Sequence, residues 1–377
     1  MWNLAVEQHS YWQPGRAPAP SYCEQARQLT EARAEFDWLA AGSQTVQQQA
    51  LRDFHQARAN FFHGTHRKPT WRKAGRHEGF RQVAVRPEHI RKLNRRTGRV
   101  RVPKVGWVRF RLSRAVPIGV KSYRVTYDRA GRWHVAFAAI PEPVPAPGTG
   151  EVVGVDRGVT VSAALSTGEK LLCPGLSERE ERRLRRLQRR LARAQQGSSR
   201  RARLKAVIAR LNARAADRRR DWIEKTSTGL ARRYDLIRVE DLNIAGMTRS
   251  ARGTVEQPGR SARAKAGLNR GILAAGWGRL VTRLDHKAPN RVEKINPAFT
   301  SQTCSACGHR APDNRESQAV FRCVACGHQD NADVNAAKNI RERGIELASA
   351  AGLAVAGRGD LGNSRSMKRQ PPVRVAA

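Results

Sequence analysis

Acidic residues are scarce in this sequence of 377 residues. Asp and Glu together number 32 against 71 Lys and Arg, which gives a formal net charge of +39. A folded chain with that excess repels itself unless a polyanion neutralises it, so the composition favours a nucleic-acid partner. A ribosome-associated protein and arginine drift in a GC-rich genome are the alternatives. Drift explains the preference for Arg over Lys but not the shortage of acids.

Long apolar runs are also missing. No window approaches the length of a membrane span, and the opening residues MWNLAVEQHSYW lack a basic segment followed by an apolar stretch. We therefore expect a cytoplasmic protein with no membrane partner, associated with the nucleoid of a bacterium or archaeon. Of only six cysteines, Cys23 and Cys173 stand alone and are expected to be ordinary buried thiols.

The other four cysteines form two CxxC pairs, each of which continues into a Cys-Gly-His step. Two thiolates three residues apart can hold one ion from a tight turn, and two such turns complete a tetrahedron. Free thiols or disulfides are the alternative, which a reducing interior disfavours. We expect a zinc ribbon whose Zn²⁺ is structural, because four thiolates leave no open position; the ligands are Cys304, Cys307, Cys323 and Cys326.

Three carboxylates stand at the ends of expected elements. Asp156 and Glu240 each end an apolar, strand-like run, and Asp333 begins a helix just after the second cysteine pair. A three-stranded meander, a helical excursion, then a fourth strand and a helix is the order of a ribonuclease-H-like fold, in which strand ends would bring these acids together. Converging acids hold Mg²⁺ for phosphodiester hydrolysis. Each acid alone would more often be a surface carboxylate.

The remaining pattern predicts further elements. Ser43 or Thr45 caps an amphipathic helix that reaches Phe61, and a second helix precedes it through Leu29, Phe36 and Leu39. The basic segment 65–81, with Trp71, suits either a nucleic-acid groove or a solvated loop. Strands are expected at 99–103, 106–112, 122–127 and 132–140, a basic helical hairpin with a leucine seam at 178–234, a mobile segment at 246–270, and helices at 271–285 and 335–347.

Four runs resemble the TnpB (OrfB) family of insertion-sequence proteins, and the likeness extends over about residues 1–350. They are GVDRG at 154–158, VEDL at 239–242, TSQTCSACG at 300–308 and NADVNAA at 331–337; QALRDF at 49–54 fits the family's N-terminal helical region. The resemblance implies a DNA endonuclease guided by an RNA from the transposon end, related to type V CRISPR effectors. It also implies a catalytic Asp156, Glu240 and Asp333, with Asp241 and Asp330 as bystanders.

We therefore expect an α+β multidomain protein: a helical lobe with a small β-barrel, then a ribonuclease-H-like (RuvC) α/β domain with an inserted zinc ribbon. The expected divisions are a helical hairpin lobe (1–64), a basic loop and antiparallel β-barrel (65–140), a Pro-rich linker (141–150), a nuclease core (151–300) with a basic helical insertion (178–234), the zinc ribbon (301–329), the last nuclease motif and helix (330–350) and a disordered tail (351–377).

The start of the sequence departs from the family pattern, in which a basic strand precedes the first helix. Here MWNLA at 1–5 already belongs to that helix, which leaves a barrel with one strand fewer or a start codon further upstream. Two other functions stay open, a transposase that transfers DNA strands directly and a non-catalytic nucleic-acid-binding regulator of transposition. The complete acid set argues against the regulator, and the lack of a Tyr or Ser recombinase motif argues against covalent strand transfer.

Overall fold

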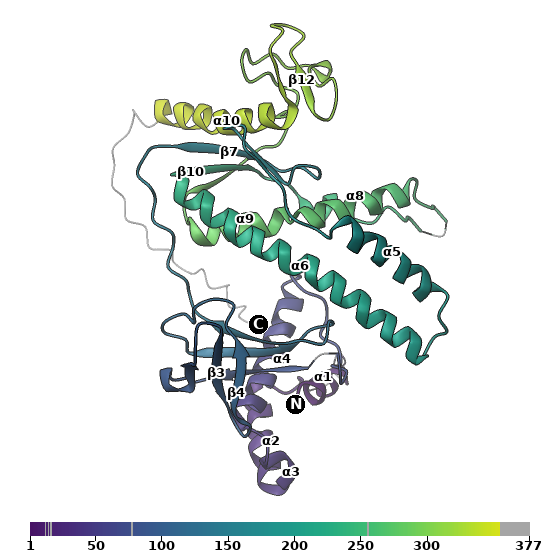
Figure 1. Cartoon of the computed structure of the whole chain (residues 1–377). Helices are drawn as coiled ribbons and strands as arrows, with labels where there is room; N and C mark the ends of the chain where they lie inside the picture. The colour runs from purple at the N-terminus through teal and green to yellow at the C-terminus, as the bar shows by residue number, and fades with distance from the viewer. Residues whose placement is uncertain (12, 14, 16, 77, 255, 355–377) are drawn as a thin grey trace, which may run out of the picture. The chain divides into compact units, whose positions relative to one another are not determined.

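The computed structural model describes residues 1–354 except 12, 14, 16, 77 and 255 (Figure 1). The chain divides into two compact units: Met1–Glu142 with Pro174–Arg220, and Pro143–Cys173 with the residues from Asp221 on. The first boundary therefore lies in the Pro-rich segment. No described helix combines the length and the apolar character needed to cross a membrane.

The first unit begins with helices, whose bounds are α1 Trp2–Ser10, α2 Tyr22–Glu35, α3 Asp37–Ala40 and α4 Gln44–Phe62. Ser43 caps α4 as the sequence predicts, by accepting a hydrogen bond from the backbone N–H of Val46. The expected helix through Leu39 is wrong at one point. Phe36 has extended backbone angles (φ −114°, ψ 107°) that separate α2 from α3, and its ring is exposed rather than packed in the core.

Two three-stranded antiparallel sheets follow in the first unit. One has the order β1-β5-β6 and the other β2-β3-β4, and they share one apolar core. The bounds are β1 Gly79–Val83, the 3-10 turn η1 Pro87–His89, β2 Ile90–Lys92, β3 Thr97–Val102, β4 Gly106–Arg111, β5 Ser122–Tyr127 and β6 Trp133–Ala138. The sequence reasoning missed β1 and β2, because their basic residues hide the alternation that marks a strand.

A long helical hairpin consists of α5 Glu178–Ala192 and α6 Ser199–Arg233. Ser177 and Glu180 form a capping box that starts α5. The predicted leucine seam is confirmed, since its side chains pack as one cluster: Leu184, Leu187, Leu191, Leu204, Val207, Ile208 and Leu211. The second half of α6 belongs to the second unit, where Ile223 and Leu230 are fully buried.

The second unit is built on a five-stranded sheet with the order β11-β10-β7-β8-β9. Strands β7, β10 and β11 are parallel, while β8 and β9 run antiparallel as a meander with β7. The bounds are β7 Val152–Asp156, β8 Ala163–Leu165, β9 Lys170–Leu171, β10 Leu236–Glu240 and β11 Val292–Ile295. The predicted meander and fourth strand are therefore present.

Helices cover both faces of this sheet (Figure 1). On one face, Val153 and Val155 of β7 pack in a core with α6 and with α9 Trp277–Lys287. On the other face, α10 Ala332–Ala354 lies against β7 and β10. Because side chains alternate along a strand, Gly154 and Asp156 face α10. The same alternation puts Glu240 of β10 on the α10 face, since Val239 packs in the opposite core.

The remaining segments of the second unit differ in part from expectation. Two short elements, α7 Ile244–Met247 and α8 Ala262–Ala275, occupy much of the segment expected to be mobile. The expected single helix at 271–285 is two helices, because Gly276 adopts φ +74° and separates α8 from α9. The ribbon between β11 and α10 contains η2 Pro312–Asn314, β12 Val320–Arg322 and β13 Gln329–Asn331. The expected tail at 355–377 lies outside the described residues.

Gly154 lets α10 approach β7 closely. A Cβ atom on Gly154 would lie 2.0 Å from the carbonyl oxygen of Ala337 and 2.6 Å from the backbone nitrogen of Arg341. Both atoms belong to the backbone of α10, so no side-chain rotation can relieve the contact. A glycine is therefore required where the helix carrying Asp333 meets the strand carrying Asp156.

We predict that Gly154→Ala lowers the free energy of unfolding by about 1–3 kcal/mol, the usual cost of overpacking. Gly229→Ala is the matched control, because a Cβ atom there meets nothing within 4 Å and alanine favours the helix. Denaturant unfolding of both variants and the parent measures the effect. Equal stability of the Gly154→Ala variant and the parent would contradict close packing of α10 on β7.

Candidate functional site

The three predicted carboxylates gather on one face of the second unit's sheet. Asp156 and Glu240 end the neighbouring parallel strands β7 and β10, whose register pairs Val155 with Val239. Asp333 lies in the first turn of α10, which packs against β7. Sequence reasoning identified the three residues, and the structure brings the elements that carry them together. The neighbours Asp241 and Asp330 take other positions, and Asp330 accepts an ion pair from Lys338 at 2.8 Å.

The carboxylates affect one another electrostatically. Burial, followed by the negative charges of Glu240 and Asp333, raises the pKa of Asp156 from 3.8 to about 7. A carboxyl in this setting resists ionisation unless positive charge enters the site. The oxygen-only donor set is the one that hard divalent cations such as Mg²⁺ prefer, so the residues present fit that ion.

Two arginines approach this acidic site, and sequence reasoning assigned a role to neither. Arg157 is buried and donates a hydrogen bond to the backbone carbonyl of Glu240. Arg315, from the ribbon segment between the two cysteine pairs, lies 3.6 Å from the carboxylate of Asp333 and also lowers the pKa of Asp156. Arg157 belongs to the GVDRG run and could have been suspected from it, whereas no sequence signal marks Arg315.

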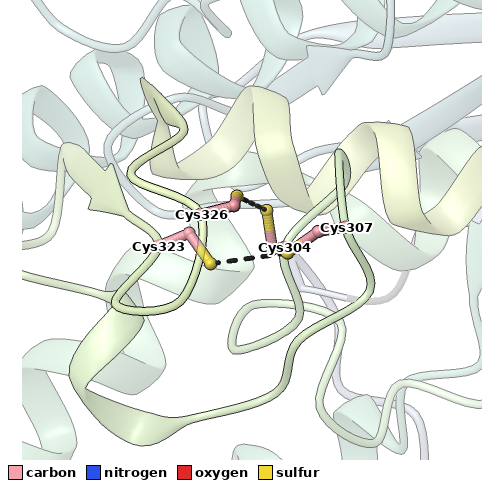
Figure 2. Close-up of side chains that lie close together, drawn as sticks. All are labelled: Cys304, Cys307, Cys323 and Cys326. Carbon is pink, nitrogen blue, oxygen red and sulfur yellow. Dashed lines mark hydrogen bonds between the residues drawn. The ribbon is translucent and has the colours of Figure 1, made fainter.

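The four predicted zinc ligands converge in the ribbon (Figure 2). Their sulfur atoms all lie within 4.8 Å of one another, with Cys304 to Cys326 at 3.8 Å and Cys307 to Cys323 at 3.6 Å. Zinc–sulfur bonds of about 2.3 Å in a tetrahedron place sulfur atoms about 3.8 Å apart, so the cluster has the size of a zinc site. The prediction that these four residues form one metal-sized cluster is confirmed.

The two turns that carry the cysteines are built alike. Gly308 and Gly327 have φ angles of +76° and +73°, and each donates its N–H to the carbonyl of the first cysteine of its pair. The buried side chain of Asn314 joins the turns, because it donates to the carbonyl of His309 and accepts from the N–H of Val324. The backbone N–H of Cys326 helps to lower the pKa of Cys323 to about 6, which favours the thiolate that binds zinc.

The expectation for the two single cysteines is wrong for Cys23. That thiol is exposed, because its position on α2 faces away from the apolar core of the helices. Cys173 is partly buried.

A strongly basic face covers the sheet β2-β3-β4 of the first unit. Arg91, Arg99 and Arg109 lie directly opposite one another on the three strands. Trp107 is held between Arg91 at 4.8 Å and Arg99 at 4.7 Å from its ring centre. No acid occurs between Glu88 and Asp128, and within the described chain these arginines form no ion pair. Like charges side by side destabilise a sheet, so this face suits a polyanion.

Comparison with known proteins gives matches over most of the chain. Residues 134–251 match the family model described as "Probable transposase", and residues 277–340 match the "Cas12f1-like, TNB domain". The chain is 37% identical to the "Putative RNA-guided DNA endonuclease InsQ" of Escherichia coli (strain K12), over 91% of this chain and 83% of that protein. It is 31% identical to a "Putative RNA-guided DNA endonuclease" of Streptomyces pristinaespiralis, over 100% of this chain and 91% of that protein.

A likeness in fold alone extends to a solved structure. The chain resembles the one in "Cryo-EM structure of the Cas12f1-sgRNA-target DNA complex" with a TM-score of 0.55 and 15% identity. The likeness covers 90% of this chain and 79% of that one.

The raised pKa of Asp156 predicts a pH dependence of stability in the metal-free protein. The folded-state pKa of about 7 exceeds the reference value of 3.8, so the folded protein holds this proton more tightly than the unfolded chain. That contribution to stability is complete below about pH 4 and disappears as the pH rises to about 7. Thermal unfolding across this range should show the loss in the parent but not in Asp156→Asn, which carries no titrating group at that position.

Adding Mg²⁺ should reverse the trend, because the ion replaces the proton. Below pH 7 the apparent Mg²⁺ affinity should fall about tenfold per pH unit, as one proton must leave for each binding event. A Mg²⁺ affinity that does not change between pH 5.5 and 8 would contradict the raised pKa.

Loss of one cysteine ligand should release the zinc. Cys323→Ser is expected to lower the zinc content from about one ion per chain to near zero and to unfold the ribbon, because metal binding there is coupled to folding. Cys23→Ser, which removes an exposed thiol of the first unit, should keep its zinc. Elemental analysis of purified protein provides the measurement, and a well-folded parent without zinc would refute the ribbon assignment.

Proposed function

The chain belongs to the TnpB (OrfB) family of insertion-sequence proteins, and on this premise we propose that it is an RNA-guided DNA endonuclease. The proposal rests on two relatives named for that activity, which match nearly the whole chain. The observation that carries it is structural: adjacent parallel strands end in Asp156 and Glu240 on the face where α10 begins with Asp333. We propose these three residues as the catalytic, Mg²⁺-binding set.

Each carboxylate has a role in this proposal. Asp156 and Glu240 would hold divalent cations from the strand ends, and Asp333 would close the site from α10. Two Mg²⁺ ions, when bound, supply an activated water and neutralise charge at the departing oxygen of the phosphodiester. Arg315, within 3.6 Å of Asp333, adds positive charge at the rim and would favour an approaching phosphate.

The finer fold assignment is also a proposal. The strand order, with an antiparallel meander joined to two further parallel strands, supports a ribonuclease-H-like (RuvC) class for the second unit. The common core of the two sheets in the first unit supports a small β-barrel. We retain the divisions at 65–140, 151–300 and 301–329 as working boundaries, and a DNA substrate would place the protein at the nucleoid.

Recognition would be divided between RNA and protein. In a guided nuclease, base pairing carries the sequence information, and the protein supplies a basic channel for the backbones. The net charge of +39, the arginine face of β2-β3-β4 and the basic hairpin of α5 and α6 are consistent with that role. We propose DNA as substrate and an RNA from the transposon end as guide; oligomeric state is left open.

Exchange of the guide tests the proposal. The protein is purified with its bound RNA, the guide portion is replaced, and the cuts on double-stranded DNA are mapped. We expect the cut sites to move with the guide and cutting to require both RNA and Mg²⁺. Asp156→Ala, Glu240→Ala and Asp333→Ala should each abolish cutting and leave RNA affinity nearly unchanged, because phosphate contacts elsewhere dominate binding.

The other functions give different outcomes. Cuts that stay fixed when the guide changes, or that need no RNA, would indicate a direct transposase or an unguided nuclease. Tight nucleic-acid binding with no strand cleavage under any guide would indicate a regulator of transposition. Retained cutting in Asp156→Ala would refute the catalytic assignment itself.

A further inference from the structure

The structure joins the zinc ribbon to the acidic site through residues 300–305, which we term the latch. The latch follows β11 and ends just after the first zinc ligand, Cys304. At its start, the hydroxyl of Thr300 lies 2.6 Å from Oε1 of Glu240, with both residues buried at 3% and 8% exposure. The same hydroxyl lies 3.1 Å from the carbonyl of Pro297. Its single proton is expected on the shorter bond to the charged acceptor.

Two asparagines of α10 fix the latch from the other side. Asn339 donates to the carbonyl of Thr300 at 2.8 Å and to that of Thr303 at 2.6 Å. Asn335 also donates to the carbonyl of Thr303, at 2.8 Å, and accepts from the N–H of Ser305. The two asparagines are four residues apart and so share one face of the helix. Asn335 is completely buried, so its polar atoms need these partners.

These contacts form a closed circuit around the proposed metal site. Asp333 begins α10, Asn335 and Asn339 follow on the same helix and hold the latch, and Thr300 of the latch holds Glu240. The backbone of the latch enters the first cysteine turn, where the N–H of Cys304 donates to the carbonyl of His309. Zinc ligation therefore fixes one end of the segment whose other end orients a carboxylate.

We propose that Thr300 is a positioning residue for Glu240, and that the latch makes divalent-metal binding at the acidic site depend on zinc in the ribbon. This inference rests on the proposed metal role of Asp156, Glu240 and Asp333. A hydroxyl suits the task because it holds one carboxylate oxygen without adding a charge. A lysine or arginine at this place would compete with the metal ion for the same carboxylate.

Substitution of Thr300 separates positioning from packing. Thr300→Val keeps the shape and removes the hydrogen bond, and loss of such an outer partner typically weakens metal affinity about 10–100-fold. Thr300→Ser should restore near-parental affinity. Thr303→Val is the matched control, since that hydroxyl donates only locally, to the carbonyl of Phe299. Titration of the RNA-bound, zinc-loaded protein with Mn²⁺ alone, by calorimetry, measures affinity independently of cutting.

The cutting assay gives a second readout. Thr300→Val should raise the Mg²⁺ concentration for half-maximal cutting about tenfold, with the rate largely recovered at saturating Mg²⁺. Parental Mn²⁺ affinity in Thr300→Val, or an equal loss in Thr303→Val, would overturn the positioning role. An unchanged zinc content and unfolding temperature in Thr300→Val would show that the loss does not come from misfolding.

The dependence on zinc is tested by Cys326→Ser, which removes an exposed ligand. We expect its Mn²⁺ affinity to fall about as far as in Thr300→Val, and the double variant to be no weaker than either single one, because both interrupt the same circuit. Additive losses, or parental Mn²⁺ affinity without zinc, would refute the coupling.

The control Asp156→Ala separates this inference from the proposed function. Its loss of Mn²⁺ binding would place the ion at the acidic site whether or not guided cutting occurs. Binding that persists in Asp156→Ala would reject the metal site and the inference together. Guided cutting in the parent with no effect of Thr300→Val would reject the inference alone.

Discussion

Repulsion among three carboxylates is the constraint on which this structure depends. Burial and the charges of Glu240 and Asp333 raise the pKa of Asp156 to about 7, so the fold must hold together groups that would otherwise separate. Rigid elements do this: two parallel strands fix Asp156 and Glu240 side by side, and α10 is pressed against β7 at Gly154. The stored repulsion makes the site selective for what relieves it, namely divalent cations.

The two metal sites have opposite chemistry, and the chain connects them. Four thiolate donors with no open position suit a structural zinc ion, whereas oxygen donors at the strand ends suit magnesium. The ribbon interrupts the chain between β11 and α10, so both of its ends lead to elements that carry or orient the carboxylates. Arg315 and Thr300, which flank or enter the ribbon, make direct contacts with Asp333 and Glu240. The ribbon is thus part of the acidic site rather than an appendage.

Sequence reasoning found the residues whose chemistry is written locally. The cysteine spacing predicted the sulfur cluster, the apolar runs before Asp156 and Glu240 predicted strand ends, and the leucine seam of α5 and α6 was read from its period. It missed β1 and β2, where basic residues obscure the alternation, and the break at Gly276, since a glycine in a helical pattern can also be tolerated. The contacts of Thr300 and Arg315 depend on tertiary placement, which no local pattern encodes.

The central claim is that Asp156, Glu240 and Asp333 form one divalent-metal site. It is tested most directly by locating Mn²⁺ in crystals of the RNA-bound protein from its anomalous scattering. The account predicts two ions about 3.5–4 Å apart, liganded by these three carboxylates. An absence of Mn²⁺ from the strand ends, or its binding at other acids while these carboxylates stay free, would contradict the account.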